Sequence, residues 1–275
     1  MKIDTTIVDS YLESKDVKKY ESLWLYDFTT ERGIKNIFQL PPESANKRKV
    51  VADIKEEIIL YSNNFIPCNS KIWDTLFDNW REFLDNTTLD LIVGYPEPYD
   101  AVVKQAPDGK YHMIFDILCW EKYVGKINLS EAIQNLLTHE LFHVMIENHF
   151  PDIELKESQG LYIEQLDAIT FNEGFAHLVS YNQQEIDKVL WNGEKLVEVY
   201  NSSVVKMKNA LQEKNKEKQV EYIYEANHGN YYDKYAAICG MIYLGQEWQC
   251  GGNERLKELF FEGYNGFATK SVKLH

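Results

Sequence analysis

Residues 138–143 read Thr-His-Glu-Leu-Phe-His and lie inside a stretch with helical periodicity that runs from Ile133 to about Glu147. At about 100° per residue, positions four apart differ by only about 40° around a helix. His139 and His143 therefore lie one turn apart on the same face, and both imidazoles can reach one cation. Glu140 lies to the side, where its carboxylate can contact a water molecule rather than the ion. This pattern predicts a metal-binding helix.

The surroundings of the motif favour metal binding over core hydrogen bonds. Asn128 or Ser130 supplies an N-cap and Glu131 an acidic first turn. Apolar residues surround the two histidines: Ile133, Leu137, Leu141, Val144 and Met145. A buried helix must satisfy its polar side chains, and a shared metal ion does so for both imidazoles. His149, at the helix exit, is expected to be a surface or capping residue.

A catalytic zinc ion has three protein ligands and keeps the fourth position for water. The next apolar helix, from about Leu161 to Tyr181, contains Asn-Glu-Gly-Phe-Ala at residues 172–176. This phrase resembles the third-ligand segment of the alanyl aminopeptidase family, which belongs to the gluzincin metallopeptidases. The resemblance implies Glu173 as the third zinc ligand. The 29 residues between His143 and Glu173 exceed the gap in that family, so a longer loop over 148–160 is expected.

Other side chains of this second helix compete for the metal. Glu164 and Asp167 lie on other sides of it, where solvation at the surface is expected. His177, one turn beyond Glu173 on the same face, can be a ligand, a substrate contact or a group that orients a ligand. Some gluzincins have Asp at that position, so the identity of the orienting group stays open.

Peptide hydrolysis also needs a donor for the developing oxyanion. Residues 230–242 begin with tyrosines, an acidic residue and a lysine, and then continue apolar. They resemble the following helix of the same family, and the resemblance implies that Tyr232 polarises the scissile carbonyl. Tyr231, Tyr235 and His228 are close enough in sequence to take this role instead. Aromatic core packing is the alternative for each tyrosine.

The residues and the resemblance together predict an α+β fold. Apolar runs at 89–93 and 111–118, with a hairpin around Asp108-Gly109, indicate a small mixed or antiparallel sheet in a mainly helical chain. The resemblance covers about 128–182 and 228–268, including a helix after Gly251-Gly252. It implies a thermolysin-like metallopeptidase catalytic domain with an active-site cleft between two lobes.

Two regions are expected along the chain. Residues 1–85 form an N-terminal helical region, with helices at 11–25 and 50–61 and a segment at 73–84 that buries one face. Residues 86–275 form the catalytic domain, with the sheet and zinc helices in 86–182 and a helical lobe in 183–275. The polar run at 212–219 is expected to be an exposed helix end or loop.

Composition limits the partners. A net charge of −14 and a pI of about 5.0 disfavour nucleic acid. No apolar stretch approaches the roughly 18 to 20 residues of a membrane span, and residues 1–5 lack a secretory signal, so a cytoplasmic protein is expected. The four cysteines are widely spaced and form no C-x-x-C pair, which favours free thiols.

These observations predict a zinc-dependent peptidase with Glu140 as general base. A peptide or protein substrate is expected to pair with the edge of the sheet at 99–119. The chain lacks the Gly-x-Met-Glu-Asn strand that holds the free amine in the aminopeptidase family, so an endopeptidase is favoured. An aminopeptidase with Asp116 or Glu121 as amine anchor is the first alternative. A non-catalytic zinc-binding regulatory protein and a metal hydrolase of other substrates are the others. Oligomeric state is left open.

Overall fold

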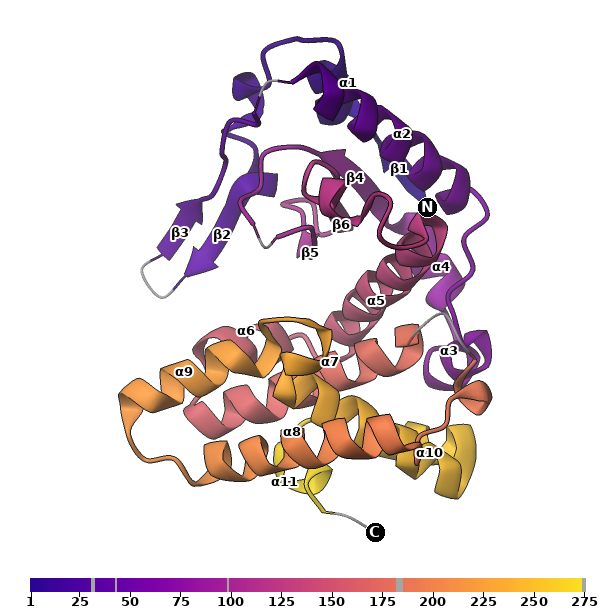
Figure 1. Cartoon of the computed structure of the whole chain (residues 1–275), viewed down its shortest axis with the longest axis vertical. Helices are drawn as coiled ribbons and strands as arrows, with labels where there is room; N and C mark the ends of the chain where they lie inside the picture. Colours follow the sequence, from indigo (N-terminus) through magenta and orange to yellow (C-terminus); the bar gives the residue numbers. More distant parts are fainter. Residues whose placement is uncertain (31–32, 43, 98, 182–184, 274–275) are drawn as a thin grey trace. The chain divides into compact units, whose positions relative to one another are not determined.

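The computed structural model describes residues 1–30, 33–42, 44–97, 99–181 and 185–273 (Figure 1). The chain divides into two compact units. The first consists of Met1–Ile66 and Asn79–Val144, and the second of Pro67–Asp78 and Met145–His275. The boundary between Val144 and Met145 falls inside helix α5 (Leu129–His149). The chain is mainly helical with a small mixed sheet, which confirms the α+β class.

The first unit contains a four-stranded sheet in the order β1-β4-β6-β5. Its strands are β1 (Lys2–Asp4), β4 (Thr88–Ile92), β5 (Ala101–Gln105) and β6 (Tyr111–Asp116). β1 and β6 run parallel to β4, and β5 runs antiparallel to β6. The hairpin between β5 and β6 turns at Gly109, whose φ of +85° is accessible to glycine at little cost. The predicted hairpin and mixed sheet are therefore confirmed.

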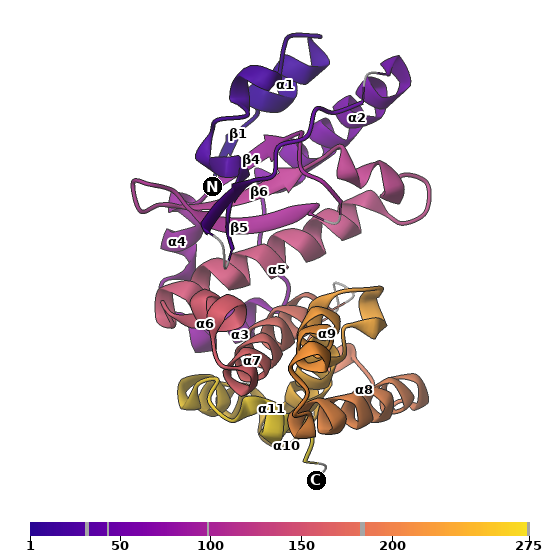
Figure 2. The ribbon, with the colours of Figure 1, turned by 90° about the vertical axis from the view of Figure 1, so that its left-hand side faces the viewer.

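Helices cover both faces of this sheet. In Figure 2, α1 (Thr6–Leu12) and α2 (Ala45–Ser62) lie on one side of the strands, and the part of α5 that belongs to the first unit lies on the other. Every residue of β4 is buried, as expected for a central strand covered on both faces. The predicted helix at 50–61 is confirmed by α2.

The N-terminal region differs from the predicted one in its first thirty residues. A helix was expected over 11–25, but α1 ends at Leu12, and Ser14 has a φ of +60° that a helix cannot accommodate. Two 3₁₀ helices follow, at Lys18–Tyr20 and Trp24–Tyr26. Strands β2 (Asp27–Thr30) and β3 (Gly33–Asn36) then form a separate antiparallel pair.

The segment at 73–84 is also broken. It forms two helices, α3 (Ser70–Leu76) and α4 (Trp80–Asn86), because Phe77 adopts an extended conformation with φ −137° and ψ 101°. Trp73 and Trp80 are buried, at 1% and 2% exposure, as the apolar spacing predicts. The two tryptophans belong to different units, since α3 lies in the second and α4 in the first.

The second unit consists of helices. Besides α3 and the end of α5 it contains α6 (Ile153–Gln159), α7 (Tyr162–Ser180), α8 (Glu194–Gln212), α9 (Lys216–Asn227), α10 (Tyr235–Glu262) and α11 (Phe267–Ser271). All residues of α7 from Leu166 to Ser180 are buried, which accounts for its nearly continuous apolar sequence. The exposed turn between α8 and α9 confirms the prediction for 212–219.

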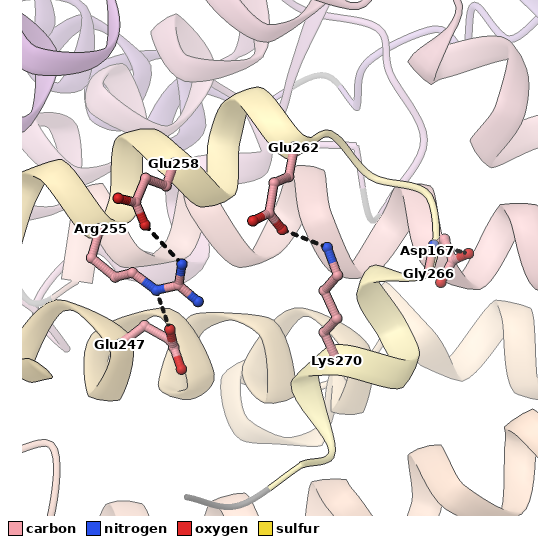
Figure 3. Close-up of polar contacts among 7 residues, drawn as sticks. All are labelled: Asp167, Glu247, Arg255, Glu258, Glu262, Gly266 and Lys270. Atoms are coloured by element: carbon pink, nitrogen blue, oxygen red, sulfur yellow. Dashed lines mark hydrogen bonds and ion pairs between the residues drawn. The ribbon is translucent and has the colours of Figure 1, made fainter. Parts of the chain in front are cut away.

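Helix α10 is interrupted at Gly252, whose φ of 64° and ψ of −155° are not helical. This is where the Gly-Gly pair predicted the start of a new helix. Figure 3 shows the guanidinium of Arg255 joining the two parts of α10. Its Nε donates to Glu247 before the break at 2.5 Å, and its Nη1 donates to Glu258 after the break at 2.9 Å.

No helix among the described residues has both the length and the apolar character needed to cross a membrane. All four cysteines are free, as predicted: Cys68 and Cys239 are buried, Cys119 is partly buried and Cys250 is exposed.

Candidate metal site

The helix with the His-Glu-x-x-His motif begins at an asparagine cap. The side-chain oxygen of Asn128 accepts a hydrogen bond from the Glu131 backbone at 3.4 Å, and its amide donates to the Glu131 carboxylate at 3.2 Å. Ser130, the other candidate cap, donates instead to Glu57 at 2.6 Å. Asn128 therefore starts α5.

His139 and His143 turn the same ring nitrogen toward one point. Their Nε2 atoms are 3.0 Å apart, and the ring centroids are 4.7 Å apart with the planes at 80°. Two nitrogens bound to a tetrahedral zinc at about 2.05 Å would be separated by roughly 3.3 Å. The pair thus has nearly the spacing of two ligands of one ion.

Apolar, buried residues surround the motif on this helix. Leu137, Leu141 and Phe142 are fully buried, and Glu140, between the two histidines, is only 5% exposed. A carboxylate in such surroundings loses hydration, so it favours a nearby cation or donor. The predicted apolar surroundings of the motif are confirmed, with Glu140 buried and His139 and His143 partly buried.

In the second unit, α7 places Glu173 and His177 one turn apart, at 8% and 4% exposure. The Nδ1 atom of His177 lies 2.9 Å from the Glu173 carbonyl oxygen and 3.4 Å from its carboxylate. A proton on Nδ1 satisfies both contacts. It leaves Nε2 with the lone pair that a metal ligand needs.

A close helix crossing fixes the position of this pair. A Cβ atom on Gly174 would lie 2.9 Å from the Cα of Gly240 on α10, and one on Gly240 would lie 2.3 Å from the Thr170 carbonyl oxygen. Only glycines permit the two backbones to approach so closely. The glycine that follows Glu173 thus sets the position of α7 against α10.

The two competing carboxylates of α7 are both used elsewhere. Glu164 accepts from the Leu161 backbone at 2.9 Å and pairs with Lys156 at 3.0 Å, at the surface as expected. Asp167 is 5% exposed, so its predicted solvation is wrong. Its oxygens accept from the backbones of Gly266 and Ala268 at 2.8 and 2.9 Å (Figure 3 draws the first). It therefore anchors α11.

Two partly buried glutamates of the second unit, Glu157 and Glu147, were not predicted from the sequence. Burial raises the pKa of Glu157 to about 8, with a further contribution from Glu173, and Asn172 donates to its carboxylate at 2.8 Å. Burial also raises the pKa of Glu147 to about 8. The sequences of the two helices do not distinguish a buried glutamate from a solvated one at these positions. Only the packing of the second unit brings them together.

The candidate oxyanion donors fall into two groups. The rings of Tyr231 and His177 are 5.3 Å apart, and the hydroxyls of Tyr232 and Tyr181 are 3.0 Å apart. The Tyr231 and Tyr232 rings are 5.0 Å apart. Burial raises the pKa of Tyr231, so its phenol remains a protonated donor at neutral pH. These two tyrosines belong to the surroundings of His177.

The other two candidates have different partners. The Tyr235 hydroxyl donates to the Tyr222 carbonyl oxygen at 3.0 Å. The His228 ring stacks on Tyr224 with centroids 4.3 Å apart, and its Nδ1 lies 2.8 Å from the Tyr224 carbonyl oxygen.

The proposed amine anchors of the aminopeptidase alternative also have structural partners. Asp116 is fully buried and accepts from the backbones of Tyr95 and Leu118 at 2.6 and 3.0 Å. Burial raises the pKa of Asp116 to about 6. Glu121 pairs with Lys47 at 3.2 Å. His149 is exposed, as expected, with its ring against Phe150, Phe260 and Phe261.

No family model matches this chain, and comparisons with curated proteins and with solved structures give no match either.

Proposed function

We propose that this protein is a zinc-dependent metallopeptidase, with His139, His143 and Glu173 as the zinc ligands. The observation that carries the proposal is the 3.0 Å separation of the two Nε2 atoms on α5, beside the buried carboxylate of Glu140. A pair of histidines held for packing alone has no need of a buried acid between them.

The donor set supports zinc. Two imidazoles and one carboxylate are the ligands of many catalytic zinc ions. Within the second unit, Glu173 and His177 offer a carboxylate and an imidazole one helical turn apart. We propose that His177 orients Glu173 through its Nδ1 atom. If His143 does not bind the zinc ion, His177 is the residue that would take its place as a ligand.

Each side chain then has a defined role. Zinc, when bound, supplies the Lewis acid that lowers the pKa of water from about 15.7 toward about 7. Glu140 takes the proton of the attacking water and passes it to the leaving amine. Tyr232 donates a hydrogen bond to the carbonyl oxygen as negative charge develops there. The hydroxyl of Tyr181 holds that of Tyr232 in place.

The sheet supports a peptide substrate. β5 is the last strand of the order β1-β4-β6-β5, so among the described strands it pairs on one side only. A peptide can add to such an edge through its own backbone groups. Because Asp116 and Glu121 have structural partners, we propose an endopeptidase with a thermolysin-like catalytic fold, acting in the cytoplasm.

The proposal is tested by measuring zinc content and casein cleavage together. Wild type and Glu140→Gln should both bind one zinc ion, and only wild type should cleave denatured casein. Glu131→Gln, on the exposed first turn of the same helix, is the matched control and should cleave like wild type. Equal cleavage by Glu140→Gln would refute the assigned base. A zinc-loaded wild type that cleaves no peptide would favour a binding or regulatory protein.

A further inference from the structure

A pocket of about 350 Å³ in the second unit lies beside the tyrosines of the candidate site. Its volume is within the range of small-ligand sites. The residues that matter for its chemistry are Tyr181, Lys188, Val189, Glu194, Lys195 and Leu196. We call it the Lys195 pocket.

Tyr181 connects this pocket to the candidate oxyanion donor. It lines the pocket, and its hydroxyl lies 3.0 Å from that of Tyr232. Lys195, in the first turn of α8, has its Nζ 4.7 Å from the centroid of the Tyr232 ring. A ligand in the pocket would therefore be adjacent to the residue that we assign to the carbonyl oxygen.

The lining combines an aliphatic surface with a cation. Leu190 lines the pocket and is 79% exposed, so it presents an aliphatic surface on which methylene groups can pack, while Val189 and Leu196 are buried in the wall. Lys188 pairs with Asp187 at 3.8 Å. No carboxylate of the described residues forms an ion pair with Lys195, whose recorded contact is the Tyr232 ring. Lys195 is thus the cation of this pocket that can accept an anionic partner.

The net negative charge of the chain bears on the role of Lys195. A net charge of −14 repels acidic peptides at long range, and this repulsion is screened beyond about 8 Å at physiological salt. Selection for an acidic substrate therefore requires a local positive group at the point where the substrate is held. Lys195 has that position, although Glu194 on the same rim weakens its effect.

We infer that the Lys195 pocket binds a carboxylate of the peptide substrate, which makes the enzyme selective for acidic peptides. The carboxylate can come from an acidic side chain or from the peptide's C-terminus, since both present the same group to the lysine. This inference rests on the proposed peptidase function and extends it to a substrate class.

The test starts from a casein peptide that the wild type cleaves, resynthesised in matched forms. One pair differs by Glu against Gln at a single position, scanned through the peptide. A second pair differs by a free C-terminal carboxylate against an amide. We expect the wild type to favour one carboxylate form about tenfold in kcat/KM, mainly through KM, and the pair that shows this preference identifies the source. The preference should decrease as salt is raised.

Three variants separate Lys195 from its neighbours. Lys195→Met should abolish the preference, and Lys208→Met, the matched control at an exposed position on the same helix and outside the pocket, should keep it. Glu194→Gln should increase it. An equal kcat/KM for all matched forms in wild type, or a preference that survives in Lys195→Met, would overturn the inference while leaving the peptidase intact. The same pairs are titrated into zinc-loaded Glu140→Gln, where equal binding of acid and amide forms also overturns it. Cleavage of no peptide by wild type overturns the proposed function instead.

Discussion

The Cα atom of Gly240 on α10 would lie only 2.9 Å from a Cβ atom placed on Gly174 of α7. The two longest buried helices of the second unit thus cross with backbone against backbone. Glu173 precedes the glycine of this crossing, so its carboxylate is carried by a helix that cannot shift along its neighbour without a clash.

Gly240→Ala tests this crossing. The added methyl would lie 2.3 Å from the Thr170 carbonyl oxygen, a backbone atom that cannot turn away. We expect a loss of about 2 kcal/mol in the free energy of unfolding, because overpacking costs roughly 1–3 kcal/mol and the better helix propensity of Ala offsets at most about 1. Urea denaturation measures it. Ser202→Ala, exposed on α8, should stay within about 0.5 kcal/mol, and an equally small effect of Gly240→Ala would contradict the account.

His139→Gln should remove stoichiometric zinc, because glutamine cannot replace an imidazole nitrogen as a ligand. The zinc affinity should fall by more than about 10–100-fold, which is the loss typical when a residue that hydrogen-bonds a metal ligand is removed. Zinc per chain after dialysis against a weak chelator is the measurement. His149→Gln changes an exposed histidine on the same helix and should leave zinc content at one. Full zinc loading of His139→Gln would exclude this ligand.

Tyr232→Phe should reduce kcat by about 10²–10³ with little change in KM, as loss of one oxyanion donor does. Zinc content and the unfolding midpoint should remain near those of wild type. Tyr235→Phe is the matched control, since its hydroxyl donates to the Tyr222 carbonyl oxygen. If Tyr231→Phe shows the large effect and Tyr232→Phe does not, the role passes to the ring beside His177.

The pH dependence of stability should change in Glu147→Gln. Burial raises the pKa of Glu147 from 4.5 to about 8 in the folded protein. Between these values the folded protein keeps a proton that the unfolded chain has lost, so stability is full below pH 4.5 and falls as pH rises through 8. Glutamine stays neutral throughout. We therefore expect the variant to gain about 1 kcal/mol over wild type between pH 5 and 8, less than full burial would give because the residue is partly exposed.

Chemical denaturation with EDTA present measures this difference without a contribution from zinc. Glu131→Gln, at an exposed position, should follow wild type across the same range. A constant offset between Glu147→Gln and wild type at all pH values would show that the carboxyl is ionised in the folded protein.

Arg255→Met should destabilise the second unit by roughly 2 kcal/mol, because it leaves the carboxylate of Glu247, only 2% exposed, without its charged donor. Adding Glu247→Gln should recover part of this loss, since the buried charge is then removed. Lys270→Met removes a pair whose side chains are 35% and 47% exposed and should cost less than about 1 kcal/mol. Thermal unfolding of the three variants measures these losses, and the contacts involved are drawn in Figure 3. An equal loss for Arg255→Met and Lys270→Met would contradict the prediction.

The sequence predicted the elements whose signals are local. The helix that begins at Asn128, the helix around Glu173 and the turn at Gly109 all follow from caps, periodicity and a glycine with positive φ. The apolar spacing over 73–84 predicted burial correctly, but it did not reveal the break at Phe77 between α3 and α4. Spacing does not show that two successive turns pack in different units.

The candidate site shows the same division. The positions of His139 and His143 follow from the pitch of a helix, and Glu140 from its place between them. Asp167 could not be assigned, because its partners Gly266 and Ala268 lie 99 and 101 positions further along the chain. The high pKa of Glu157 likewise depends on helices that fold around it.

The contact between Asp167 and the backbone of α11 has a practical consequence. A chain cut after Glu262 would lose both donors of a carboxylate that is almost fully buried on α7. That uncompensated charge would weaken the very helix that carries Glu173. Removal of residues 263–275, by a protease or in the design of an expression clone, should therefore weaken the proposed metal site at a place far away in sequence.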